Sequence, residues 1–216
     1  MKALAINGSP RKNWNTATLL EHALSGCRDG GAETEMVHLY SHTYQGCTSC
    51  FSCKRIGGPS YGRCGIRDEL TPILDRAHVA DILILGSPFY FHTETGEMRS
   101  FMERLLFQYL TYTPDYAAIF PRKISTAFVY TMNVPEERMH LVNQDSSVSA
   151  SQSTMARIFG SCEVLLCTDT YQFDDYSKYL STMFDAEAKA RRRKDVFPLD
   201  CERAYELGTR LAVAAQ

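Results

Sequence analysis

The chain has 216 residues, 44% of them hydrophobic and 22% charged, and its formal net charge is -2. This composition is typical of a globular protein with one sizeable core. The small negative charge argues against nucleic acid or an anionic membrane as a partner. No apolar run reaches the ~20 residues that span a bilayer, and the N-terminal segment lacks the features of a signal peptide. We therefore expect a cytoplasmic protein whose eight cysteines are mostly reduced.

Short apolar runs alternate along the chain with stretches of helical period. Strands are predicted at residues 2–7, 33–39, 81–86, 124–130 and 162–168. Helices are predicted at residues 16–28, 68–77, 96–110, 146–159, 185–194 and 201–215. This alternation predicts an α/β fold, a doubly wound sheet of five parallel strands with helices on both faces. We expect one domain over residues 1–170. We expect a helical extension over 171–216 that packs on this domain or on a partner subunit, with the basic run at 191–194 as a solvated face.

The segment between the first strand and the first helix has the composition of an anion-binding loop. Gly8 ends the apolar run, and Ser9, Arg11, Asn15 and Thr16 supply hydrogen-bond donors. The first N–H groups of a helix have no internal partner, and the helix dipole favours negative charge there. The further glycines of the Walker and dinucleotide fingerprints are absent. At this point two interpretations stay open: a phosphate site of another kind, and an ordinary βα turn.

Two further loops are expected at the same sheet edge, because ligands of open α/β sheets bind outside the carboxyl ends of the strands. Residues 87–96 are interpreted as a loop, in which three aromatic side chains follow a proline: Pro88, Phe89, Tyr90 and Phe91. Residues 131–135 add amide and hydroxyl groups, beginning with Thr131, Met132 and Asn133. A phosphate at the first loop and a flat ring against the aromatics describe a mononucleotide, and FMN fits both ends. Packing or a subunit contact is the alternative for the aromatics.

Four of the eight cysteines lie in the irregular segment 40–66. Cys47, Cys50 and Cys53 have the spacing that lets three thiolates face one cluster, and Cys64 follows after ten intervening residues. Three alternatives stay open. The cysteines bind a [4Fe-4S] cluster, they bind zinc, or they bind no metal and pack as small hydrophobes or act as reactive thiols.

Three segments together resemble the flavodoxin-like NADPH-dependent FMN reductases, and among them the branch that includes iron-sulfur flavoproteins. They are Gly-Ser-Pro-Arg at 8–11 with Asn-Thr at 15–16, the cysteine run at 46–53 with Cys64 and Asp68, and residues 86–91 with 96–104. The resemblance covers residues 1–170. It departs at Trp14, where the family often has glycine, and at residues 92–94, where small residues are commoner. In the iron-sulfur flavoproteins the fourth cysteine follows more closely.

The resemblance implies roles position by position. The FMN phosphate falls on Ser9, Arg11, Asn15, Thr16 and Ala17. The isoalloxazine falls on Pro88, Phe89, Tyr90 and Phe91, with Thr131, Met132 and Asn133 nearby. The resemblance also implies a homodimer or homotetramer, and the aromatic-rich residues 107–120 are typical of an interface.

The activity implied by the resemblance is an FMN-dependent oxidoreductase. Hydride passes from NAD(P)H to FMN, and electrons then pass to a small-molecule or protein acceptor. No side chain has to act as an acid or base, so no catalytic residue is assigned, and the only candidate metal ligands are the four cysteines. An alternative is an electron-transfer protein that carries FMN and a [4Fe-4S] cluster. A third reading is a mononucleotide-binding protein without enzymatic activity.

Overall fold

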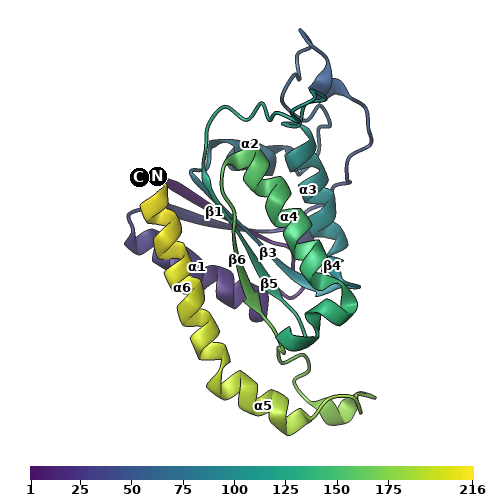
Figure 1. Cartoon of the computed structure of the whole chain (residues 1–216), viewed down its shortest axis with the longest axis vertical. Helices are drawn as coiled ribbons and strands as arrows, with labels where there is room; N and C mark the ends of the chain where they lie inside the picture. The colour runs from purple at the N-terminus through teal and green to yellow at the C-terminus, as the bar shows by residue number, and fades with distance from the viewer.

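The computed structural model describes residues 1–216 and shows a central sheet with helices on both faces (Figure 1). The strands are β1 (Lys2–Asn7), β2 (Glu33–His38), β3 (Ile82–Tyr90), β4 (Thr93–Glu94), β5 (Ser125–Thr131) and β6 (Glu163–Cys167). The helices are α1 (Asn15–Asp29), α2 (Thr71–Val79), α3 (Gly96–Phe107), α4 (Gln144–Phe159), α5 (Ala186–Asp195) and α6 (Phe197–Ala214). No helix combines the length and apolarity that crossing a bilayer requires.

The five long strands are parallel and lie in the order β2-β1-β3-β5-β6. Without the short β4, this is the strand order of flavodoxin-like doubly wound sheets, and the predicted five-stranded parallel sheet is confirmed. The sixth strand, β4, pairs antiparallel with the end of β3. The strand order reverses between β1 and β3, so the carboxyl ends of these strands border the place where such folds bind ligands.

Residues 89–94 form a β-hairpin, and the prediction of residues 87–96 as a loop was wrong. The apolar run ends at Gly86, but β3 continues to Tyr90 because β5 pairs beside it as far as Pro88 and Thr131. Phe91 and His92 form the two-residue turn, with φ of 50° and 70°. Such turns ordinarily carry Asn-Gly, so the sequence gives no hairpin signal here.

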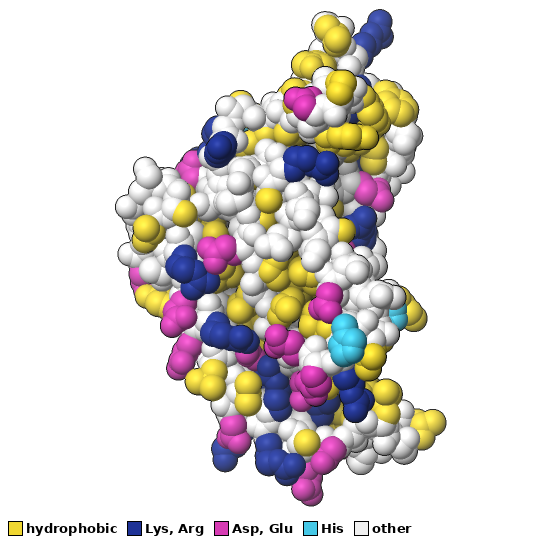
Figure 2. All heavy atoms as spheres, viewed as in Figure 1, with side chains coloured by type: hydrophobic (Ala, Val, Ile, Leu, Met, Phe, Trp, Pro, Cys, Tyr) yellow, Lys and Arg dark blue, Asp and Glu magenta, His cyan; other side chains and the backbone are white.

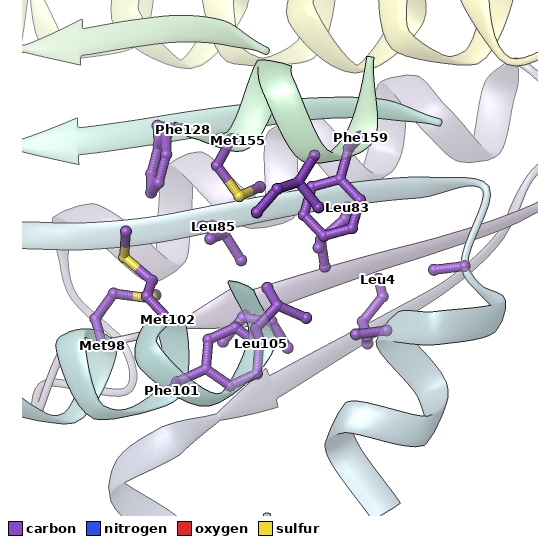
Figure 3. Packing of buried hydrophobic residues seen from close by; sticks show 14 of the residues in the cluster. Leu4, Leu83, Leu85, Met98, Phe101, Met102, Leu105, Phe128, Met155 and Phe159 are labelled. Carbon is purple, nitrogen blue, oxygen red and sulfur yellow. The ribbon is translucent and has the colours of Figure 1, made fainter. Parts of the chain in front are cut away.

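Two apolar cores cover the two faces of the sheet. Figure 3 shows the larger core, in which α3 and α4 pack onto the strands. Its labelled members are Leu4, Leu83, Leu85, Met98, Phe101, Met102, Leu105, Phe128, Met155 and Phe159. On the other face α1 and α6 pack on the sheet and on each other through residues that include Leu19, Leu20, Leu207 and Leu211.

Helices α1 and α6 lie side by side at very short range (Figure 1). A Cβ atom on Gly208 would lie 1.8 Å from the carbonyl oxygen of Ala23, and one on Gly26 would lie 2.1 Å from that of Tyr205. Cys27 Sγ also donates to the carbonyl of Gly208 at 3.4 Å. Glycine is therefore required at both positions of this helix contact.

Candidate functional site

The loop after β1 turns tightly against the sheet edge. The backbone N–H of Gly8 donates to the carbonyl of Gly86 at 2.8 Å, and a Cβ atom on Gly8 would lie 2.8 Å from Met98 Cβ. Asn7 Oδ1 accepts from the backbone N–H of Ser9 at 2.9 Å, and Ser9 Oγ accepts from that of Arg11 at 3.2 Å. The side chains of the loop thus fix its own path.

Helix α1 begins without a side-chain cap. Trp14 occupies the N-cap position in an extended conformation, and no side chain accepts from the first turn. The N–H groups of that turn are therefore available to an anion. Asn15 and Thr16 are buried in this turn, and the Thr16 and Thr131 hydroxyls hydrogen-bond at 2.8 Å, which ties the start of α1 to the end of β5.

A cavity of about 150 Å³ joins this loop to the hairpin and to the end of β5. It is lined by most of the cofactor-binding residues assigned from the sequence: Ser9, Arg11, Asn15, Thr16, Pro88, Phe89, Tyr90, Thr131, Met132 and Asn133. Two assigned residues lie elsewhere. Ala17 is buried within α1, and Phe91 is 99% exposed at the tip of the hairpin.

The cavity is completed by residues that the sequence reasoning missed: Trp14, Thr170, Tyr171 and Gln172. Arg11 Nη1 donates to the carbonyl of Gln172 at 2.6 Å. Trp14 Nε1 and Asn15 Nδ2 donate to the carbonyl of Tyr171 at 3.3 and 3.0 Å. One signal pointed to this segment, because it follows the fifth parallel strand at the same sheet edge.

Glu94 is a buried carboxylate behind the aromatic hairpin. Its Oε1 accepts from the Tyr130 hydroxyl at 2.6 Å and from Ser151 Oγ at 2.7 Å. The ring of Phe89 packs edge-on against Tyr130, with ring centroids 4.8 Å apart. Burial opposes ionisation of Glu94, but these hydrogen bonds outweigh it and hold the pKa of the carboxyl below its usual range. The ionised side chain anchors the hairpin that lines the cavity.

The cysteine segment lies at the other end of α3 from the hairpin (Figure 1). Arg104 is buried on α3 and donates to Cys64 Sγ at 3.3 Å, while its guanidinium also pairs with Asp68. Lys54 Nζ donates to the carbonyl of Phe107 at the C-terminus of α3. Two cations therefore hold the cysteine segment against the helix.

Cys47, Cys50, Cys53 and Cys64 line one small cavity of about 10 Å³, room for about one water molecule. All four are free thiols. Burial raises the pKa of the Cys53 thiol, whereas hydrogen bonding to Ser52 lowers that of the exposed Cys50. No three or more His, Cys, Asp or Glu side chains are arranged to hold a metal ion. The donor chemistry suits an iron-sulfur cluster, but the cavity is too small for one in this arrangement.

A larger groove of about 490 Å³ runs between α3 and α4. Its apolar lining includes Met102, Leu106, Phe107, Leu110 and Ile158. Figure 2 shows hydrophobic side chains gathered on this face toward the cysteine segment. The groove lies over helices, away from the strand ends that border the first cavity.

The sequence model of the NADPH-dependent FMN reductases matches residues 1–131. The chain belongs to this family. Among curated relatives, an iron-sulfur flavoprotein of Archaeoglobus fulgidus is 36% identical over 106 residues, which cover 49% of this chain and 46% of the relative. One of Methanocaldococcus jannaschii is 36% identical over 104 residues, which cover 48% of this chain and 51% of the relative. The chain spans about half the length of the curated relatives it matches.

Solved structures share the fold of this FMN reductase family member over nearly its whole length. An NAD(P)H:quinone oxidoreductase from Methanothermobacter marburgensis superposes with a TM-score of 0.71 at 13% identity, covering 98% of each chain. An FMN-dependent NADH-azoreductase from Bacillus anthracis, solved in complex with FMN, gives 0.68 at 12% identity over 98% of this chain and 100% of that one. An archaeal flavodoxin gives 0.52 at 14% identity over 100% and 99%. The fold is flavodoxin-like.

Proposed function

We propose that this protein binds FMN at the carboxyl edge of its sheet and is an FMN-dependent oxidoreductase. It takes hydride from NAD(P)H and passes electrons to a second acceptor, either a small molecule or a protein. The observation that carries the proposal is the cavity between the uncapped start of α1 and the aromatic hairpin, in a chain of the FMN reductase family. When bound, FMN supplies a ring that accepts hydride and releases electrons.

The side chains around the cavity fit the two ends of FMN. At the loop end, Ser9, Asn15 and Thr16 offer buried hydroxyl and amide groups, Arg11 a guanidinium, and the first turn of α1 free N–H groups, a donor set suited to a phosphate. At the hairpin end, the ring of Phe89 is only partly buried and is available to a flat heterocycle.

The test is flavin binding by the purified protein. We expect flavin absorbance after addition of FMN, and oxidation of NADH or NADPH by the loaded protein. Arg11→Met should weaken FMN binding about tenfold, because it removes a charged donor to the phosphate. Lys12→Met is the matched control, since Lys12 is exposed in the same loop and lines none of the cavity. A protein that stays colourless in excess FMN would refute the proposal.

An iron-sulfur flavoprotein is the second candidate. It is supported by the four cysteines that line one cavity and by the names of the curated relatives. Cys47, Cys50, Cys53 and Cys64 would hold the cluster, and this requires the segment to open beyond its present cavity of about 10 Å³. Anaerobic purification with iron and sulfide assays decides it: about four irons per chain support the cluster, and near-zero iron removes it.

We also propose that the protein is at least a dimer and resides in the cytoplasm. The apolar groove between α3 and α4 and the exposed Tyr112 and Tyr116 beyond α3 are suited to a subunit contact. Eight free thiols are in keeping with a reducing compartment. A monomeric mass by light scattering would contradict the proposed dimer. Recovery of the protein outside the cytoplasmic fraction would contradict the proposed location.

A further inference from the structure

The basic run of α5 is not simply the solvated face that its composition predicts. Figure 2 shows charges of both signs crowded over the part of the surface where α5 and α6 lie. Two of the four cations nevertheless turn inward. Arg192 pairs with the buried Asp200, and Arg193 donates through Nη1 to Asn15 Oδ1 at 2.7 Å. Arg191, by contrast, makes only an exposed pair with Glu187 on its own helix.

The contact with Arg193 determines which way the amide of Asn15 faces. A guanidinium has donors only, whereas a carboxamide has one acceptor oxygen and one donor nitrogen. Arg193 can therefore hold only the oxygen of Asn15, and the Nδ2 group is left to donate to the carbonyl of Tyr171, a residue of the cavity lining, at 3.0 Å. A residue of α5 thus orients a donor at the start of α1.

Arg193 also holds the indole of Trp14. Its guanidinium carbon lies 5.8 Å from the centre of the Trp14 ring and 4.0 Å from that of Phe197. The guanidinium of Arg11 lies 5.5 Å from the same indole. These are cation–π distances, so the indole lies in contact with one cation from the loop and one from the tail.

Helix α5 keeps its place over the sheet edge through contacts that do not involve Arg193. Lys189 is buried, pairs with Asp169, and donates to the carbonyl of Asn133 at 3.1 Å. The pair between Arg192 and Asp200 joins α5 to α6. Removing the guanidinium of Arg193 should therefore leave the helix where it is, while releasing Asn15 and Trp14.

We propose that Arg193 is a positioning residue for the phosphate end of the cofactor site, acting through Asn15 and Trp14. The proposal rests on the FMN site proposed above. It makes the tail helix part of the binding site, although α5 follows the last strand of the sheet. A positioning role at the phosphate end affects FMN and spares riboflavin, which carries the same ring without the phosphate.

The test compares Arg193→Met, Arg193→Lys and the control Arg191→Met, with FMN and riboflavin affinities measured by quenching of flavin fluorescence. Arg193→Met should bind FMN about tenfold more weakly, because Asn15 is no longer held in place as a donor to the charged phosphate, and its riboflavin affinity should be unchanged. Arg193→Lys should be intermediate, since lysine keeps the charge but lacks the planar fork. Arg191→Met should match the wild type for both ligands.

A second readout needs no cofactor. Trp14 is the sole tryptophan of the chain, so intrinsic emission reports on its ring. The emission should change in Arg193→Met and stay the same in Arg191→Met. Equal losses for FMN and riboflavin, or no loss for either, would overturn the positioning role. If circular dichroism shows that Arg193→Met does not fold, the test uses Arg193→Lys, whose FMN affinity should fall relative to its riboflavin affinity. A wild-type protein that binds no FMN would instead refute the proposed function itself.

Discussion

Replacing Arg104 by methionine tests whether a buried cation holds the cysteine segment on α3. The side chain of Arg104 is fully buried, and that of its partner Asp68 is 19% exposed. The guanidinium also donates to Cys64 Sγ and to the carbonyls of Gln45 and Ile66. Methionine keeps an unbranched chain of similar reach and removes every one of these bonds.

The expected cost follows from this burial. Removing one partner of a buried ion pair costs about 3–5 kcal/mol, because the other charge is left without compensation. Asp68 retains some contact with solvent, so we expect a loss of about 3 kcal/mol in the free energy of unfolding. For a chain of this length that loss lowers the melting temperature by roughly 6–12 °C.

Urea unfolding followed by far-ultraviolet circular dichroism measures the loss, with Arg76→Met as the control. Arg76 pairs with Glu35 at the surface, where the two side chains are 40% and 46% exposed, and such pairs contribute at most about 1 kcal/mol.

The pair between Arg104 and Asp68 also predicts a pH dependence. Burial opposes ionisation of Asp68, but the hydrogen bond and charge of Arg104 outweigh burial and lower the pKa of the carboxyl. This stabilisation is present above about pH 4 and is lost as the pH falls further, so the stability difference between the wild type and Arg104→Met should shrink in acid. Equal losses in Arg104→Met and Arg76→Met would refute the reasoning.

Three further predictions use the same unfolding assay. Gly208→Ala should lose about 1–3 kcal/mol, because its Cβ would lie 1.8 Å from the carbonyl oxygen of Ala23; a neutral effect would contradict the close helix contact. The lowered pKa of Glu94 stabilises the fold above about pH 4.5, so below that pH the wild type should lose more stability than Glu94→Gln does. Parallel pH profiles would argue against this. Asn-Gly in place of Phe91 and His92 should raise the free energy of unfolding by about 1 kcal/mol, because these residues adopt positive φ angles at lower cost. A lower free energy of unfolding would show that the native side chains stabilise the turn.

The sheet could be predicted from the sequence because each long strand is an apolar or alternating run with a helical period beside it. The hairpin could not, because Pro88 interrupts the pattern and the turn uses Phe91 and His92 in place of Asn-Gly. What extends β3 is pairing with β5, and no local signal in the sequence reports that contact. The buried Glu94 was missed for the same reason.

The loop residues that line the cavity could be named from the sequence, and the contacts from the tail could not. Ser9, Arg11, Asn15 and Thr16 lie in one short segment of the sequence, and their polar groups are recognisable from the sequence alone. The contact between Arg193 and Asn15 joins residues 178 positions apart, and the composition of residues 191–194 is that of any solvated helix face. The cysteine spacing allowed three thiols to face one cluster with Cys64 as a fourth ligand, as one of three alternatives. It did not show that Arg104 and Lys54 would hold them on α3 around so small a space.

The contact between α5 and the first loop has a consequence for synthesis. Residues 8–16 leave the ribosome well before Arg193, which contacts Asn15 and Trp14 and follows Asn15 by 178 positions. A nascent chain that has emerged only as far as β6 can pair its parallel strands, yet its loop still lacks Arg193. Proteolysis should have a similar effect. A cut between β6 and α5 breaks the chain between the first loop and Arg193 but leaves every strand of the sheet intact. Pulse-labelled chains arrested at successive lengths should therefore gain FMN affinity in a late step, well after the sheet has become resistant to proteolysis.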